Sequence, residues 1–241
     1  MQKRIIKIRF SVVATAILVF MVCSALGTER LVPAQYSTIQ AAITASAHYD
    51  TIIVSPGTYN GNVSFNGKNI TLRSTDPDNP AVVAATIIRG TGTTSVVKFT
   101  NKENSSCQLA GFTITGGAGA SSGGGIAGNN YDTSPTISQC IITGNSTTSV
   151  GGGIYGCKGK ITRCVISNNS TKFGGGLSAC HGTIINCLIR NNQATNGNGG
   201  GIHNCDGSII NCTITQNTAT GEGAIILCDG TITNCIIWGN T

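Results

Sequence analysis

The residues of this chain that are best suited to chemistry are cysteines that recur in pairs. Four pairs have the form Cys-x₆-Cys: Cys157 with Cys164, Cys180 with Cys187, Cys205 with Cys212, and Cys228 with Cys235. Regularly spaced thiols can ligate a metal, form disulfides or act as a redox centre. Structural zinc sites, however, usually separate two cysteines by about two to four residues, with a second pair nearby. The spacing therefore argues against zinc.

A second set of reactive side chains directly follows the earlier cysteine of each pair. It consists of Lys158, His181, Asp206 and Asp229, and each is followed by glycine. Stacked carboxylates about 5 Å apart suit a hard cation such as Ca²⁺ or the acid pair of a retaining glycosidase, and His203 could lie near Asp206. The alternative is solvated turn residues, because Asp-Gly is a favoured turn pair and two acids are few for calcium. We favour the interpretation as turn residues and keep these four as a candidate ligand-binding site. The sequence assigns no catalytic residue, metal or cofactor.

The cysteines belong to a repeat array that fills the second half of the chain. The first cysteine column is Cys140, Cys164, Cys187, Cys212 and Cys235, with spacings of 24, 23, 25 and 23 residues. The second cysteine column is Cys157, Cys180, Cys205 and Cys228, each seven residues before a member of the first. Self-similarity at a fixed period indicates stacked units that contact mainly their neighbours.

Asparagines recur five residues after every member of the first cysteine column. This asparagine column is Asn145, Asn169, Asn192, Asn217 and Asn240. Two of its members lie in Asn-x-Ser/Thr sequons, as do Asn62, Asn69, Asn104 and Asn211, so N-glycosylation is one interpretation. We favour the other, a ladder of side-chain amides that hydrogen-bond from unit to unit.

The repeating units are predicted to consist of short strands. Glycine, asparagine and β-branched residues dominate, and no apolar stripe with a 3.6-residue period appears. In Thr183–Ile189 (TIINCLI) and Thr231–Ile237 (TITNCII) the two-residue alternation of inward and outward side chains shifts by one position midway. The chain must therefore bend around the central asparagine. Glycine triplets such as Gly151–Gly153 mark another corner, where φ is positive or close packing leaves no room for a Cβ atom.

Recurrence of the same residues predicts that successive units stack in register. Neighbouring strands would then pair parallel, roughly 4.8 Å apart, in a continuously wound β-solenoid. Stacked cysteines would point inward as a ladder of buried thiols, with vertical disulfides and metal ligation as the alternatives. Burial would also make the thiols unreactive, because it raises their pKa.

The combination of GGGI with a CxIxxN strand, as in Gly151–Ile154 and Cys164–Asn169, resembles the right-handed parallel β-helix proteins of the pectate-lyase-like superfamily. Within that superfamily the pattern is most similar to the repeats of polymorphic outer membrane proteins. Here the triplets are mostly GGG, and Ile stands where that family has Phe. The likeness covers about Gly116–Thr241 and, more loosely, Val32–Thr115. It implies an all-β, right-handed parallel β-helix.

The resemblance implies that an enzyme of that superfamily would show one of a few sets of catalytic residues, which can be compared with this chain. Pectate lyases need acidic calcium ligands and an arginine, polygalacturonases need clustered aspartates with Gly-His-Gly, and pectin methylesterases need two aspartates with glutamine and arginine. After Cys107 the acids are Asp132, Asp206, Glu222 and Asp229. The aromatic residues of the array, which could stack on sugars, are Tyr131, Tyr155, Phe173 and Trp238. The sequence does not assemble any of these catalytic sets.

The segment before the array is predicted to begin the same solenoid. Tyr36–His48 places Ile39, Ala42, Ile43 and Ala47 on one face of a helix, with Ser37 or Thr38 as N-cap, that would cover the first strand edge. A turn is expected at Ser55–Tyr59 and a protruding loop at Ser74–Pro80. Strands are expected at Thr51–Val54, Asn62–Phe65, Asn69–Arg73, Thr86–Arg89 and Ser95–Phe99.

Residues 1–27 have the order of charges and apolar residues of a secretory signal peptide, with a retained N-terminal anchor as the alternative. An apolar run, Ser11–Val22, is short for a membrane span, which needs about 20 residues. It follows a basic start made of Lys3, Arg4, Lys7 and Arg9. Removal of these four lowers the formal net charge from +6 to +2, which gives no case for nucleic-acid binding. No later stretch is long and apolar enough to cross a bilayer.

The sequence thus predicts a signal peptide (1–27), an N-terminal cap with the first coils (28–115) and repeat coils of the same β-helix (116–241). The last part is expected to be truncated, because no capping element follows Asn240. The leading functional prediction is a secreted or surface-displayed protein with a structural or adhesive role. The alternative is a polysaccharide-binding protein or a polysaccharide-degrading enzyme of the lyase or glycoside hydrolase type. The expected partner is a polysaccharide or another cell-surface ligand; the oligomeric state is open.

Overall fold

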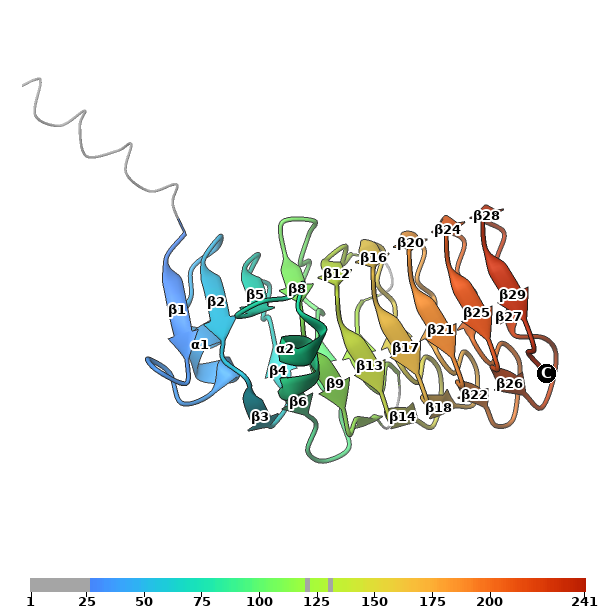
Figure 1. Cartoon of the computed structure of the whole chain (residues 1–241), viewed down its shortest axis with the longest axis horizontal. Helices are drawn as coiled ribbons and strands as arrows, with labels where there is room; N and C mark the ends of the chain where they lie inside the picture. The colour runs from blue at the N-terminus through green and yellow to red at the C-terminus, as the bar shows by residue number, and fades with distance from the viewer. Residues whose placement is uncertain (1–26, 120–121, 130–131) are drawn as a thin grey trace, which may run out of the picture.

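The chain winds into an elongated stack of coils that runs from one end of the molecule to the other (Figure 1). The computed structural model describes residues 27–119, 122–129 and 132–241. Apart from Gly27, the predicted signal peptide lies outside the described residues. Within the described part, no helix is both long enough and apolar enough to span a bilayer.

Four parallel sheets form the sides of the stack, and each coil contributes one short strand to most of them. Sheet A consists of β1 (Glu29–Val32), β2 (Thr51–Val54), β5 (Thr71–Ser74), β8 (Gln108–Ala110), β12 (Thr136–Ser138), β16 (Lys160–Thr162), β20 (Thr183–Ile185), β24 (Ile209–Ile210) and β28 (Ile232–Thr233). Sheet B consists of β3 (Gly57–Asn60), β6 (Thr86–Arg89), β9 (Thr113–Thr115), β13 (Ile141–Thr143), β17 (Val165–Ser167), β21 (Leu188–Arg190), β25 (Thr213–Thr215) and β29 (Ile236–Trp238).

The other two sheets are built of shorter strands. Sheet C consists of β4 (Val63–Ser64), β7 (Val97–Lys98), β11 (Ile126–Ala127), β15 (Ile154–Tyr155), β19 (Leu177–Ser178), β23 (Ile202–His203) and β27 (Ile225–Ile226). Sheet D consists of β10 (Ala118–Gly119), β14 (Ser146–Thr147), β18 (Ser170–Thr171), β22 (Gln193–Ala194) and β26 (Thr218–Ala219). The predicted parallel β-helix is confirmed.

Equivalent residues of successive coils stand directly over one another. Ile161, for example, pairs with Ile137 on one side and with Ile184 on the other, and all three side chains are buried. Isoleucines of this kind fill the interior from coil to coil. The hydrophobic effect of this continuous column, at about 25 cal/mol per Å² of apolar surface, is the main force that holds the coils together.

The corner between sheets A and B confirms the predicted bend. Asn186, Asn211 and Asn234 have φ values of 55°, 53° and 51°, in the left-handed region. Gln139 and Arg163, which hold this place in earlier coils, adopt it too, at 50° and 52°. The bend turns the strand so that the isoleucine before it and the cysteine after it both point inward, which explains the change of phase in the sequence.

Glycine triplets are needed at their corner for both predicted reasons. The first glycine of a triplet, such as Gly174, has a positive φ of 67°. The third, such as Gly176, lies where an added Cβ would come 2.5 Å from the carbonyl oxygen of Gly201 in the next coil. The same Cβ would lie 3.1 Å from the Nδ2 atom of Asn192, so the triplet leaves room for the asparagine column.

The asparagine column forms the predicted amide ladder at the corner between sheets B and D. Each Nδ2 atom donates to the Oδ1 atom of the asparagine one coil on, and the four distances are 3.0, 3.0, 2.9 and 3.0 Å. Each Oδ1 atom also accepts the backbone N–H of the preceding asparagine. Asn145 and Asn169 are 1% and 0% exposed, so glycosylation of these two sequons is incompatible with the folded state.

Both cysteine columns also stack inside the coils. The ten cysteines of the described residues are free thiols, and all but Cys228 and Cys235 are buried. In the first column every Sγ atom points the same way, toward the carbonyl group two residues earlier in its own coil. The buried thiol ladder is therefore the arrangement that the structure shows.

Near the N-terminus the predicted helix is present but shorter. Helix α1 (Ile39–Ala45) begins after Thr38, whose hydroxyl accepts the N–H of Ala41. Ile39 and Ile43 are buried and α1 contacts β1, β2 and β4, whereas Ala47 lies beyond the helix and is exposed. Covering of the first strand edge by this helix stays a prediction.

Two features of the first coils differ from the prediction. The segment expected as a turn at Ser55–Tyr59 enters strand β3, whose residues pair with β6 in sheet B. The loop that starts at Ser74 leads into a second helix, α2 (Pro80–Ala85), which lies against β6 and β9 on the outside of the stack (Figure 1). Asn79 caps α2 through its side chain and Pro80 takes the first turn, where a proline has no N–H to leave unpaired.

Candidate functional site

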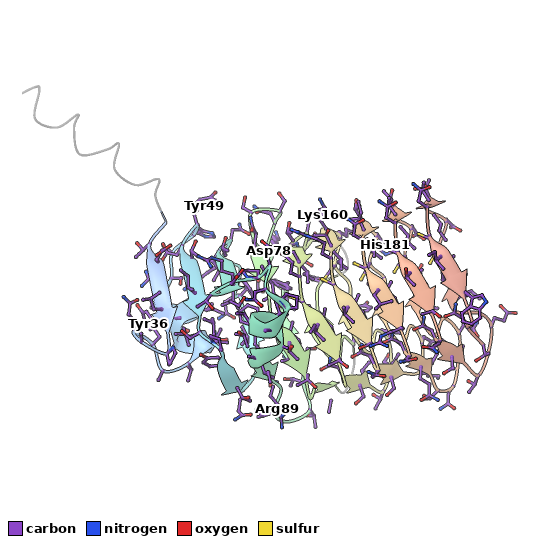
Figure 2. All side chains as sticks on the ribbon, in the orientation of Figure 1. Tyr36, Tyr49, Asp78, Arg89, Lys160 and His181 are labelled. Atoms are coloured by element: carbon purple, nitrogen blue, oxygen red, sulfur yellow. The ribbon has the colours of Figure 1, made fainter. Side chains whose placement is uncertain are left out.

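The structure brings the four predicted ligand-binding residues to one edge of the stack. Lys158, His181, Asp206 and Asp229 lie at the turns that lead from sheet C into sheet A; His181 is labelled there in Figure 2. The Nδ1 atom of His181 lies 3.1 Å from Oδ2 of Asp206. The backbone N–H of Asp229 points at Oδ1 of Asp206, 3.4 Å away. Their stacking is thus observed, while a ligand-binding role stays a prediction.

We call Lys158, His181, Asp206 and Asp229 the edge column. The glycines that follow it have a different role from the one that turn chemistry suggests. Gly182 and Gly207 do not have positive φ values. Instead, a Cβ atom on either would overlap the carbonyl oxygen of the glycine one coil earlier. The Asp-Gly and His-Gly pairs are therefore set by close approach of neighbouring coils and not by a hairpin-type turn.

His203 does not join Asp206, contrary to the expectation from their spacing. Asn204, with φ of 52°, turns the chain between them. The imidazole of His203 lies on the outer face of sheet C, where its Nδ1 atom is 3.3 Å from the hydroxyl of Ser178. Within the described residues, no three His, Cys, Asp or Glu side chains come together in a way that could hold a metal ion.

Some residue types of the catalytic set named above for pectin methylesterases, an aspartate, a glutamine and an arginine, come together elsewhere on the surface. Asp78, in the loop before α2, accepts hydrogen bonds from Gln139 and from Arg163, with 3.3 Å to the guanidinium. The side chains of Asp78 and Arg163 are 74% and 58% exposed, so they form a solvated surface pair. Neither of these two hydrogen bonds adds the second aspartate that the catalytic set contains. We therefore assign no catalytic role to this group.

The outer face of sheet C carries two ring-bearing residues of the array, Tyr155 and His203. Strand pairing places one outward side chain per coil in a row along the stack axis. In order along the axis, this sheet C row is Ser64, Lys98, Ala127, Tyr155, Ser178, His203 and Ile226. None of the seven carries a carboxyl group.

Phe173 extends this row from the side. It precedes the Gly174–Gly176 corner, and its ring lies 5.6 Å from the imidazole of His203, with 37° between the planes. The ammonium group of Lys172 lies 5.3 Å from the centre of the phenyl ring, a cation–π contact. Phe173, His203 and Lys172 thus form a ring platform beside the row.

A polar cleft lies on the same face, next to Tyr155. Its lining includes Lys98, Ala127 and Tyr155 of sheet C, together with Thr93–Ser95 and Ser122. Of the two remaining aromatics of the array, Trp238 lies 73% exposed on sheet B, and Tyr131 is outside the described residues.

Partial burial makes the folded protein sensitive to the protonation of His203. Burial lowers the pKa of His203 below its ordinary value of 6.5. The folded protein therefore binds this proton more weakly than the unfolded chain, so the contribution of His203 to stability should be constant above about pH 7 and fall as the pH drops through 6.5. We expect a decrease in Tm of roughly 1–2 °C between about pH 8 and pH 5.5, measured by calorimetry, and its loss in His203→Phe. An equal decrease in the variant would contradict this assignment.

Parallel coils in register and an amide ladder define a parallel β-helix protein. No protein-family model matches the chain, and no curated protein matches it. Among solved structures the chain is similar to a pectin methylesterase from Aspergillus niger, with 14% identity over 90% of this chain and 86% of that chain and a TM-score of 0.49. The functional conclusion therefore rests on this chain's own side chains.

The sequence analysis named Tyr155, Phe173 and His203 separately and did not predict that they lie on one face. A signal was available, since Tyr155, Ser178 and His203 each come two residues before a member of the second cysteine column. That constant offset places them in one row. The contribution of Phe173 could not be read this way, because it depends on the path of the corner before β19.

Proposed function

We propose that this chain is an extracytoplasmic β-helix protein that binds an extended polysaccharide along the outer face of sheet C. The observation that carries the proposal is the alignment of Tyr155 with the ring platform of Phe173 and His203 along the stack axis. Tyr155 and His203 stand two coils apart, roughly 9.6 Å at the spacing of parallel strands. A linear chain of sugars laid along the axis would meet both.

The chemistry of the face favours binding over cleavage. Flat rings offer apolar surface to the C–H faces of sugars, while hydroxyl and ammonium groups of Thr94, Lys98 and Lys172 offer hydrogen bonds to their rims. Glycoside hydrolysis requires a pair of carboxyl groups beside the scissile bond. The sheet C row supplies none, so the proposal is a binding protein and not a hydrolase.

Replacing Phe173 with alanine tests the proposal. The change removes one stacking surface, so we expect the dissociation constant for the bound polysaccharide to rise roughly threefold to tenfold. Affinity electrophoresis against neutral and acidic polysaccharides, with and without Ca²⁺, would identify the ligand, and calorimetry would give the constant. Trp238→Ala is the matched control, because it removes an exposed aromatic from sheet B.

Two results would overturn the assignment. Equal loss of affinity in Phe173→Ala and Trp238→Ala would show that the ring platform has no special part. Calcium-dependent binding that disappears in Asp206→Ala and Asp229→Ala but survives in Phe173→Ala would move the site to the edge column.

A display or adhesion role is the second candidate, and sheet B supports it. One outward row of this sheet consists of Thr115, Thr143, Ser167, Arg190, Thr215 and Trp238, and the other includes Ile141, Val165 and Leu188. Such a side, with one mainly polar and one apolar row, suits a surface presented to a partner more than a groove that encloses a ligand. The repeat likeness to polymorphic outer membrane proteins and the predicted signal peptide belong to this candidate as well. Detection of the protein on the outside of intact cells would support it.

A further inference from the structure

The two cysteine columns place free thiols next to one another in successive coils. Strand register places Cys187 beside Cys164 on one side and beside Cys212 on the other, since Leu188 pairs with Val165 and with Thr213. Cys205 stands in the same way between Cys180 and Cys228: its Sγ atom lies 3.2 Å from the backbone nitrogen of Cys180, and its own backbone nitrogen lies 3.4 Å from Sγ of Cys228. Every internal cysteine of a column thus has two equivalent sulfur neighbours.

The backbone around the columns is at the separation that a disulfide needs. The N–H of Cys180 contacts Sγ of Cys205 at 3.2 Å, and the N–H of Cys212 contacts Sγ of Cys235 at 3.4 Å. In-register parallel strands set the Cα atoms roughly 4.8 Å apart, within the range of about 4.4–6.8 Å found in disulfides. Formation of a bond between neighbouring coils therefore needs rotation of side chains and no shift of the backbone register.

We propose that the cysteine columns are sites of oxidation, in which nearest neighbours along a column form disulfides that link adjacent coils. Cys107 stays a thiol, because residues of other types, Ile70 and Pro135, stand beside it in the adjacent coils. Bonds between the two columns, such as Cys157 to Cys164 within one coil, do not form. The inference is independent of what the sheet C face binds.

The oxidant is a small-molecule disulfide of the glutathione type. A cysteine thiolate attacks this disulfide, a mixed disulfide forms, and one glutathione thiol leaves. The neighbouring thiolate then attacks the protein sulfur of the mixed disulfide, the S–S bond between the coils forms, and the second glutathione thiol leaves. Two cysteine thiols lose two electrons and two protons, and the glutathione disulfide gains both.

Oxidation belongs to the folding of the chain and not to the finished stack. Burial raises the pKa of Cys164 and Cys205 well above its ordinary value of 9.0, so a thiol that is still reduced when the coils have stacked no longer reacts. While coils are still docking one after another, each new thiol meets its neighbour before the next coil covers it.

Nearest-neighbour pairing makes a numerical prediction because the first column has five members and the second has four. Each column can form two disulfides, and one thiol of the first column is left with Cys107. Replacing Cys187 leaves the neighbours Cys140–Cys164 and Cys212–Cys235, so four disulfides remain. Replacing Cys164 isolates Cys140 and leaves three consecutive thiols, so only three disulfides remain.

The experiment counts thiols after refolding of the full chain in a mixture of reduced and oxidised glutathione. Cys23, outside the described residues, is replaced by serine in every sample, and free thiols are alkylated and counted by mass spectrometry. We expect two alkylated cysteines in the parent, three in Cys164→Ser and one in Cys187→Ser. Peptide mapping of the parent gives the pairs even if a variant fails to fold.

The outcomes separate clearly. Ten alkylated cysteines in the refolded parent would show that the columns stay reduced and would overturn the proposal. Equal counts in Cys164→Ser and Cys187→Ser, or mapped bonds between the two columns, would show that pairing does not follow the stack and would also overturn it.

Discussion

Gly176→Ala is expected to lower the free energy of unfolding by about 3 kcal/mol. The new Cβ would lie 2.5 Å from the carbonyl oxygen of Gly201 and 3.1 Å from Nδ2 of Asn192. One of these atoms belongs to backbone that pairs with the next coil, and the other to the amide ladder. Neither can move without breaking hydrogen bonds of its own, so the clash cannot be relieved locally. Chemical denaturation followed by circular dichroism measures the change.

The last described coil supplies a matched control for this substitution. Ala224 holds the place of the third triplet glycine there, since its carbonyl accepts the N–H of Gly201 and Ile225 pairs with Ile202. Ala224→Gly should change stability by less than about 1 kcal/mol, the usual effect of glycine in extended backbone. A Gly176→Ala protein as stable as the parent would show that the coils can separate to admit a methyl group.

Asn192→Ala is expected to destabilise the protein by about 3–5 kcal/mol. The amide of Asn192 donates to the carbonyl of Ile166 and to Oδ1 of Asn217, both at 2.9 Å. It also accepts the backbone N–H and the Nδ2 group of Asn169, at 3.1 and 3.0 Å. Alanine would remove the partner of the backbone N–H of Asn169 and of the carbonyl of Ile166, and would take one of two hydrogen bonds from Nδ2 of Asn169 and from Oδ1 of Asn217.

The adjacent asparagine is the control for the ladder. Asn191 is exposed and has a φ of 53°, so Asn191→Gly keeps the favoured backbone and should change stability by less than about 0.5 kcal/mol. Thermal and denaturant unfolding of both variants measure the difference. If Asn192→Ala lowered stability no more than Asn191→Gly, the amide ladder would not stabilise the fold, and water or the backbone would satisfy the same groups.

The architecture of the repeat half was predictable because identical residues recur at a nearly constant interval. Stacking in register follows from that recurrence, and the inward direction of Cys187 and Ile189 follows from the bend at Asn186. The first coils repeat less, so β1, β3 and α2 were missed. Helix α2 had a local signal, Asn79 followed by Pro80, which the prediction of a protruding loop overlooked.

The candidate site was less predictable than the fold, for a physical reason. The edge column lies next to a cysteine column in sequence and so stacks with it, whatever its side chains do. The sheet C face depends on Phe173 reaching across to His203, two coil positions that no periodic offset connects. Contacts that cross from one coil to the side of the next are set by corner geometry, which a repeat pattern does not encode.

The pairing of like residues across coils bears on how such a chain can change its length. Every described coil of the array offers the same cross-section to the coil above and below, with its isoleucine, asparagine and glycine in the same places. Duplication or loss of one whole period would leave each remaining contact with a partner of the same kind. A gain or loss of half a period would set isoleucine over glycine. Genetic variation in this region should therefore come in steps of a full period.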